Sequence, residues 1–431
     1  GPLAGRSERR PHPLALRADL QSEMPHLALG PPRRLRPPEA QLVIEPRAEM
    51  GQGIQTTLAA LLAEELDVRL SDISVEHGAS AQAYFNDAMA SNQSYEAALE
   101  DKPSGWATVM SEAFPKLMSL QVTGGSTSTI DAFEKMRLAG ATARETLLQA
   151  ASKRLKFPFE QLKTEDGKVI APNINWTAFV DLAEDAANID PPKSPKLKNK
   201  SEWRYLGKSQ PRLDQLSKAT GTAEFGIDTR LEGMLFATIR MTPRFGGAID
   251  EIDATTAKSM PGVKKIVLWD DGFGVIATNT WLAMQAAEAV DVTWSKGNAP
   301  ENTEAAFAIM EASFEDSPNV ELRNQGDIED ALSTGKIITR KYHAPFLAHA
   351  TMEPMNGTAL FQDGKLDLWA GNQAPLLIRD ACAYALDINK DDVNLHTPFL
   401  GGGFGRRVTA DFILPAAKLV KEMPGTPIQV T

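Results

Sequence analysis

The spacing of apolar residues predicts both helices and strands along the chain. Apolar side chains recur every three or four positions in six segments that we expect to be helices: 56–66, 130–155, 280–289, 303–314, 376–386 and 411–421. Short alternating or β-branched runs predict strands at 41–46, 233–239, 263–268, 274–277, 337–342, 393–396 and 428–431. Both kinds of element occur along the chain, so we expect a fold that contains helices and strands together.

Three glycine-rich turns, each directly before a predicted helix, are the most distinctive pattern. They are Gly51-Gln52-Gly53, the Gly124–Thr129 run and the Gly401–Val408 run. Glycine lets backbone N–H groups come close to an anion, and the N-terminus of the helix that follows adds partial positive charge. Each turn alone is a weak signal. Together they fit one large ligand that carries phosphate and is held between domains.

The residues in these turns leave more than one interpretation open. Gln52 either offers its amide to a ligand or is a surface residue of a tight turn. The hydroxyl groups of Ser126 and Thr127 either cap the next helix or hold phosphate oxygens. In the third turn, Arg406 and Arg407 carry planar donors that suit phosphate.

Changes in composition predict how the chain is divided. The first residues are rich in proline and arginine, and a second polar, proline-rich stretch lies near the middle. In order, we expect an extended or disordered leader (1–40), a first region (41–190), a linker (191–219), a compact α+β unit (220–296), a polar connection (297–335) and a last region (336–431). Because the chain stops inside a predicted strand, we expect a continuation beyond it.

Composition narrows the classes of partner. The 431 residues include 56 acidic and 45 basic side chains, and the net charge of −11 argues against nucleic acid or an anionic membrane as the main partner. No apolar run is long enough to span a bilayer. Cys382 is the only cysteine, so neither an internal disulfide nor a thiolate-bound iron–sulfur cluster fits, and we expect it to be a small buried residue.

Other motifs for phosphate, metal or hydrolysis do not match. The residues after Gly405 are not the Gly-Lys-Ser/Thr of a Walker loop, and Arg406 stands where a dinucleotide fingerprint needs a small residue. The six histidines lack the spacing of metal ligands, so we expect no metal held by protein side chains. The sequence also lacks the Gly-x-Ser-x-Gly elbow of a serine hydrolase.

Six segments resemble, in the same order, the molybdenum-binding large subunit of the xanthine oxidase family. The branch that they resemble most contains isoquinoline 1-oxidoreductase beta subunits and related aldehyde dehydrogenases. The resemblance covers the chain from about residue 40 to its end. The six segments are 48–68 (around Glu-Met-Gly-Gln-Gly), 123–147, 220–239, 350–360, 369–375 and 401–407.

The resemblance implies an α+β, multidomain molybdopterin-binding subunit with an α/β hammerhead domain at 220–296. Its cofactor is molybdopterin cytosine dinucleotide, and it oxidises an aldehyde or an aromatic N-heterocycle with oxygen from water. By resemblance, Phe404 and Arg406 position a molybdenum ligand, while the pterin dithiolene holds the metal. The implied cofactor contacts are Gly51, Gln52, Gly53, Gly125, Ser126, Thr127, Gly401, Gly402, Gly403, Phe404, Gly405 and Arg406. We expect Gly403→Asp to block cofactor loading, because it would put a carboxylate where the backbone meets an anion.

The resemblance also implies partners and a cellular location. Electrons leave through a separate small subunit that carries two 2Fe-2S clusters, and a cytochrome c subunit is a further candidate partner. Many relatives are exported to the periplasm. In this sequence the Arg9-Arg10 pair is followed by Pro11–Leu14 without the apolar core of an export signal, so the sequence as it stands indicates the cytoplasm.

Two departures from the family limit the expected activity. The family's general base, a glutamate in a Gly-Val-Gly-Glu-like motif near the end of a longer subunit, has no counterpart here, and Glu353 is not that residue. We therefore expect the chain alone to be inactive, and a non-catalytic cofactor-binding or assembly protein is the alternative function. Purine-oxidising relatives carry an acidic residue where Val408 stands, so an apolar heterocycle or an aldehyde fits better.

Overall fold

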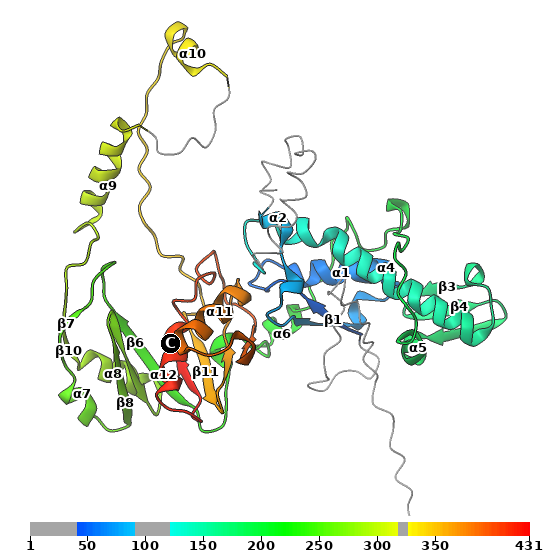
Figure 1. Cartoon of the computed structure of the whole chain (residues 1–431). Coiled ribbons are helices and arrows are strands. Elements are labelled where there is room, and N and C mark those ends of the chain that lie inside the picture. The colour runs from blue at the N-terminus through cyan, green and yellow to red at the C-terminus, as the bar shows by residue number, and fades with distance from the viewer. Residues whose placement is uncertain (1–40, 91–120, 318–325) are drawn as a thin grey trace, which may run out of the picture. The chain divides into compact units, whose positions relative to one another are not determined.

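The computed structural model describes residues 41–90, 121–317 and 326–431 (Figure 1). The chain forms two compact units. The first contains the described residues up to Ala237 together with Thr351–Thr431, and the second is Thr238–Ala350. Helices occur with both parallel and antiparallel strands, which confirms the predicted α+β, multidomain class. The predicted leader lies outside the described residues. Within the described ranges, no helix is both long and apolar enough to cross a membrane.

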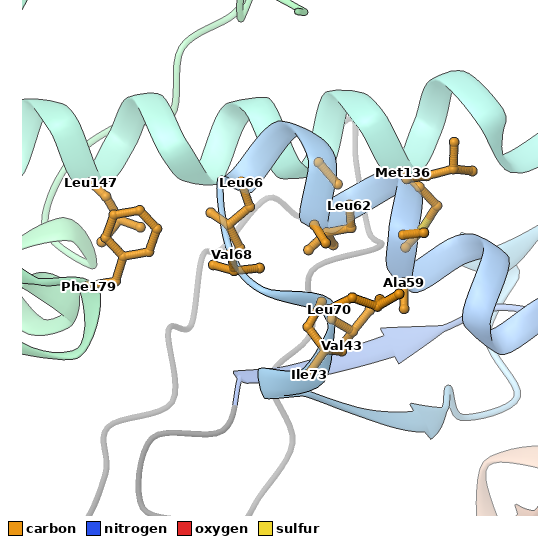
Figure 2. Packing of buried hydrophobic residues seen from close by; sticks show 14 of the residues in the cluster. Val43, Ala59, Leu62, Leu66, Val68, Leu70, Ile73, Met136, Leu147 and Phe179 are labelled. Atoms are coloured by element: carbon orange, nitrogen blue, oxygen red, sulfur yellow. The ribbon is translucent and has the colours of Figure 1, made fainter. Parts of the chain in front are cut away.

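Two packed helices over a parallel pair of strands form the centre of the first unit. Helix α4 (Ser128–Leu155) packs along α1 (Ile54–Leu66), and α1 covers the parallel strands β1 (Gln41–Glu45) and β2 (Ile73–His77). Their apolar side chains are buried against one another, as Figure 2 shows. Burial of this continuous apolar surface is the main source of stability for the unit.

A small sheet covers the C-terminal end of α4. Its antiparallel strands and the helix that follows are β3 (Lys163–Glu165), β4 (Lys168–Ala171), β5 (Ile174–Ala178) and α5 (Phe179–Ala186). Phe179 lies beside Leu147 of α4 in the apolar core (Figure 2). Gly140 allows α1 to approach α4, because a side chain at this position would meet the Leu62 carbonyl oxygen at 2.5 Å.

Residues 196–206, inside the predicted linker, lie against α1 and α4. The Glu64 carboxylate of α1 accepts the backbone N–H groups of residues 204–206 at 2.6–3.2 Å. The neighbouring Glu65 is fully buried and pairs with Arg137 of α4 at 2.7 Å. These residues are therefore bound to the helical core of the first unit. Two short helices complete this part, α2 (Asp87–Ala90) and α6 (Gln215–Ala219).

A sheet forms the other part of the first unit and leads to the last glycine-rich loop. Its strands, in spatial order, are β13 (Val393–His396), β12 (Lys365–Trp369), β11 (Gly357–Gln362), β14 (Ile428–Val430) and the start of β6 (Leu235–Met241). β11 runs antiparallel to both neighbours, whereas β12 with β13 and β14 with β6 are parallel. Two helices, α11 (Pro375–Leu386) and α12 (Leu414–Lys421), pack on these strands.

The second unit has a small apolar core between a β-hairpin, a two-stranded ribbon and two helices. Its elements are β7 (Ile249–Asp253), α7 (Thr255–Ser259), β8 (Val263–Trp269), β9 (Gly272–Ala277), α8 (Thr280–Glu288) and β10 (Asp291–Trp294), followed by α9 (Thr303–Ala312) and α10 (Ile328–Thr334). β8 pairs with β9 and β7 with β10, both antiparallel. Phe273 and Val275 of β9 are completely buried in this core.

Most elements predicted from periodicity are present, and two predictions are wrong. The pattern predicts a strand at 337–342, but this segment pairs with no described strand, and Ile338 and Tyr342 are 69% and 88% exposed. An alternating sequence forms a ladder only where another strand supplies hydrogen bonds. Helix α12 begins at Leu414 instead of Asp411, in keeping with the proline in its first turn.

Candidate cofactor-binding site

The Gly401–Arg407 loop follows β13 and turns at three residues with positive φ. They are Gly402 (100°), Phe404 (54°) and Gly405 (90°). Glycine adopts this region at little cost, whereas a residue with a side chain does so only where its surroundings hold it. The Phe404 ring is 69% exposed, so burial of the ring does not hold this turn. The turn is held by contacts that the backbone makes before and after Phe404.

Arg407 is completely buried beneath the loop and fixes its shape. Its guanidinium group donates to the Gly402 carbonyl oxygen at 3.1 Å and to the Glu353 carboxylate at 3.0 Å. The same carboxylate accepts the N–H groups of Gly401 at 2.8 Å and of Ile227 at 3.0 Å. One oxygen of the Glu353 carboxylate therefore holds the loop, while the other accepts from Ile227 and Asn356 outside it.

Both guanidinium groups of the loop are paired within the protein. Arg406 forms a bidentate pair with Asp411 at 2.9 and 2.7 Å, and its N–H donates to the Gly403 carbonyl oxygen at 2.9 Å. Arg407 is held by Glu353 as described. The sequence suggested that the two arginines face phosphate, and the structure places both of them against carboxylates instead.

Gln373, for which the sequence indicated no role, connects the loop to the rest of the site. Its side-chain oxygen accepts the Gly405 N–H at 3.1 Å, and its side-chain nitrogen donates to the Thr123 carbonyl oxygen at 2.9 Å. Its backbone accepts the Thr123 N–H at 2.8 Å and donates to the Arg407 carbonyl oxygen at 2.9 Å. The signal in the sequence was an amide between small residues in the Trp369–Pro375 motif.

The Gly51-Gln52-Gly53 loop is closed by a carboxylate from its own chain. Glu49, 2% exposed, accepts the N–H groups of Gly51 at 2.9 Å, Gly53 at 3.1 Å and Gln55 at 3.2 Å. Gln52 turns back on the loop, where it accepts the Met50 N–H at 2.7 Å and donates to the carbonyl oxygen of the residue before Glu49. The amides in this loop that were predicted to meet a ligand already have an anionic partner.

The third turn differs because no side chain caps the helix that it opens. Gly125 and Ser126 both have positive φ and are exposed. The buried Thr127 hydroxyl donates to the Gly124 carbonyl oxygen and accepts from Asn86, both at 2.8 Å, so it does not bond the first-turn amides of α4. Of the two interpretations left open, capping by Thr127 is therefore wrong, and an anion at these amides stays a prediction.

Direct hydrogen bonds join the three loops into one site. The Ala48 N–H donates to the Thr123 hydroxyl at 2.9 Å, which ties the first loop to the residue that precedes the second. The Leu400 N–H donates to the Glu49 carbonyl oxygen at 3.1 Å, which ties the third loop to the first. Gln373 completes the connection between the second and third loops. Segments far apart in sequence thus meet in one place.

Gly403 lies at the point where two of these loops meet. A side chain there would come within 2.7 Å of the Met50 sulfur and within 2.7 Å of the Gln373 side-chain oxygen. A side chain at Gly403 would therefore crowd the contact between the loops, which adds a steric reason to the expected effect of Gly403→Asp on loading.

Several backbone donors at this site have no acceptor among the described residues. They are the N–H groups of Gly402, Gly403 and Phe404 in the third loop. Consecutive amides in a turn that includes positive φ form a concave donor surface that suits an anion. The uncapped first turn of α4 is a second surface of this kind.

Two remaining predictions concern cysteine and metal. Cys382 is fully buried on α11, as expected, and burial raises the pKa of its thiol to about 12. It is therefore unsuited to nucleophilic chemistry. In the ranges that the structure describes, no three histidine, cysteine or acidic residues gather where they could hold a metal ion.

Comparison with known proteins identifies the class to which this site belongs. Residues 313–431 match the family model described as a molybdopterin cofactor-binding domain. A nicotinate dehydrogenase component of Pseudomonas putida is 29% identical over 396 residues, which cover 89% of this chain and 30% of that protein. The beta subunit of isoquinoline 1-oxidoreductase from Brevundimonas diminuta is 27% identical, and the match covers 89% of this chain and 52% of that protein. A membrane-bound aldehyde dehydrogenase (pyrroloquinoline-quinone) of Gluconacetobacter polyoxogenes is 28% identical, with 89% of this chain and 47% of that protein covered.

These matches define the class as proteins that bind a molybdenum cofactor. They confirm the resemblance found in the sequence, to the molybdenum-binding subunits of the xanthine oxidase family. The chain spans about half the length, or less, of these three relatives.

Proposed function

We propose that the chain forms the cofactor-binding part of a molybdenum hydroxylase and that the cofactor is molybdopterin cytosine dinucleotide. The observation that carries this proposal is the direct hydrogen bonding of three glycine-rich loops through Thr123 and Gln373. A ligand as long as a dinucleotide needs contacts from several loops at once, and the connected loops provide them.

The backbone N–H groups that lack an acceptor among the described residues fit the negative charge of such a cofactor. The amides of Gly402–Phe404 and the first turn of α4 are two separate surfaces that favour anionic oxygens. Phosphates would lie at Gly125, Ser126 and the start of α4, and the metal end would lie at Phe404 to Arg406. When bound, the cofactor supplies a molybdenum centre that takes up the electrons of the substrate.

The chain's own residues supply binding and orientation. Arg407 and Glu353 keep the Gly401–Arg407 loop in its turn conformation, so its amides face the ligand without rearrangement. The buried carboxylate of Glu353 is saturated by donors, so it does not move a proton in this proposal. The Phe404 ring is exposed beside the loop, where it can exclude water from the metal end.

The substrates and partners follow from the class. The matched relatives are named for nicotinate, isoquinoline and an aldehyde, so we propose an aldehyde or an aromatic N-heterocycle as the substrate. Val408, next to the loop, offers no acidic hydrogen-bonding group to a purine. With a single cysteine, the chain needs a partner to carry electrons away, and a small 2Fe-2S subunit is the proposed partner.

The test is metal and nucleotide analysis. The chain is produced together with the small 2Fe-2S subunit in a host that makes the cofactor, and molybdenum and acid-released cytidine monophosphate are measured per protein. We expect both, in a ratio of about one to one. A folded protein with neither would overturn the proposal.

A pair of glutamine variants tests whether the connected loops form the site. Gln373→Met keeps the side-chain size and removes the side-chain bonds to Gly405 and Thr123, while the backbone bond to Thr123 remains. Both contents should fall at least about tenfold if a polar network of this kind holds the loops. The control Gln215→Met changes an exposed residue of α6 and should leave them unchanged. Equal contents in the two variants would exclude Gln373 from the site.

A further inference from the structure

Arg212 binds the first glycine-rich loop from within the predicted linker. Its guanidinium group donates to the Gly51 carbonyl oxygen at 2.7 Å and to the Glu49 carboxylate at 3.0 Å. It also forms a bidentate pair with the buried Asp214 at 2.8 and 2.6 Å. The next residue, Leu213, donates its N–H to the Thr56 hydroxyl in the first turn of α1 at 3.0 Å.

Lys218 joins the same cluster and reaches toward the third loop. Its ammonium group lies 2.6 Å from the Asp214 carboxylate and 3.7 Å from that of Glu49. It also lies over the ring of Phe399, 4.7 Å from its centroid, two residues before Gly401. One side chain thus contacts the carboxylate that closes the first loop and the segment that enters the third.

The cluster contains two carboxylates and two cations, so its charges balance. Its side chains are those of Glu49, Asp214, Arg212 and Lys218. The bonds from Arg212 hold the pKa of Asp214 down, to about 2, so this carboxylate stays ionised at neutral pH. A buried carboxylate at the start of a helix is favourable only while its donors and counter-ions remain. The shape of the Gly51–Gly53 loop therefore depends on residues about 160 positions away in the sequence.

We infer that Arg212 is a positioning residue, which presets the Gly51–Gly53 loop and, through Lys218, its place beside the Gly401–Arg407 loop. This inference rests on the proposed function for its effect on the cofactor. It assigns the amides of Gly51, Gly53 and Gln55 to Glu49, so cofactor phosphates must bind elsewhere in the site. The first loop then meets the cofactor through the outward side of Gln52 and its neighbours.

Hydrogen exchange of the loop tests this inference without the cofactor. In the cofactor-free chain, Arg212→Gln should speed amide exchange at residues 51–55 by at least about tenfold, because it removes the counter-ion of a buried carboxylate. Arg212→Lys keeps the charge and should restore part of the protection. Arg154→Gln, which removes a half-exposed arginine paired with Asp185 at 3.4 Å, is the matched control.

The same variants are then tested for cofactor content and unfolding. Loss of molybdenum in Arg212→Gln, with exchange elsewhere unchanged, would support positioning. Unchanged exchange at residues 51–55 would overturn the inference, and so would equal exchange in Arg212→Gln and Arg154→Gln. If Arg212→Gln fails to fold, Lys218→Gln replaces it with the same expectations on a smaller scale. Faster exchange in Arg212→Gln, together with a wild-type chain that never takes up molybdenum, would leave the inference standing and reject the proposed function.

Discussion

The Gly51–Gly53 loop and the Gly124–Thr127 turn have the same pattern in the sequence and opposite properties in the structure. Each has glycine residues directly before a long, buried helix. In the first, the Glu49 carboxylate takes the amides at the start of α1. In the second, the Thr127 hydroxyl bonds within the turn and the start of α4 has no side-chain cap. One loop is closed by an internal anion, and the other is open to an external one.

The difference teaches that a glycine turn before a helix is an anion site only if the chain does not fill it. Glu49 precedes its loop by two residues and can reach back onto the amides that follow. No acidic residue stands at the same distance before Gly124, where Val122 and Thr123 are found. The nearest acid, Asp131, lies inside α4 and is paired with the buried Arg47. The presence or absence of one carboxylate therefore decides which turn can hold phosphate.

The largest expected effect comes from breaking the buried pair that closes the third loop. Arg407→Met leaves the Glu353 carboxylate buried without its cation, and loss of one partner of a buried pair costs about 3–5 kcal/mol. Urea unfolding measures this loss. Arg406→Met is the control, because its pair with Asp411 is partly exposed and should cost about 0–1 kcal/mol. Equal losses in the two variants would contradict the described difference between the arginines.

A second prediction contrasts Glu49 with Glu45, which lies four residues earlier on β1. Glu45 is completely buried, and neither of its oxygens has a hydrogen-bond partner among the described residues. Burial raises its pKa well above 4.5, and the charge of Glu49 raises it further. Glu45→Gln should therefore stabilise the protein by about 1–3 kcal/mol at pH 8 and change little at pH 4.

The sign follows from the protons that each state binds. Below pH 4.5 the folded and unfolded forms both keep the Glu45 proton, so stability is undiminished there. As the pH rises toward the folded pKa, unfolding releases this proton and becomes more favourable. Urea unfolding between pH 4 and 8 tests the prediction, with Glu76→Gln on the neighbouring strand as the control. A gain of the same size at both pH values would contradict it.

The smallest effect comes from filling the open turn. Thr129 is exposed in the first turn of α4, and Thr129→Asp places a carboxylate where an anion would bind. Without cofactor the change should stabilise the protein by about 0.3–1 kcal/mol, and it should also lower the molybdenum content of the loaded protein. Thr129→Asn, without the charge, should do neither. A stabilised Asp variant with normal molybdenum content would exclude phosphate from this turn.

Local patterns in the sequence were sufficient to predict most helices and strands. They were insufficient to predict the contacts between residues far apart in the chain. The apolar spacing predicted α1, α4 and α11 to within two residues, because all three bury apolar side chains that recur at helical spacing. The strand at 337–342 failed because a strand needs a partner, which periodicity does not report. The start of α12 was predicted three residues too early, in keeping with the proline in the first turn of the observed helix.

The candidate site shows the same division. The three loops were found from glycine and hydroxyl spacing, since those residue types mark turns in any fold. The roles of Glu49, Gln373 and Arg212 were missed, because each depends on a residue far away in sequence or on a side chain that turns back. The hydrogen bond between Gln373 and Thr123 joins residues 250 positions apart, and no local rule contains it.

The contacts of the Glu353 carboxylate bear on whether the protein folds before or after it binds its cofactor. It gathers donors from Ile227, Asn356, Gly401 and Arg407, which belong to three separate parts of the chain. The last glycine loop can take its final form only after these parts have assembled. We therefore expect the apoprotein to fold first and to bind its cofactor in a preformed site, so cofactor delivery is a late step in maturation.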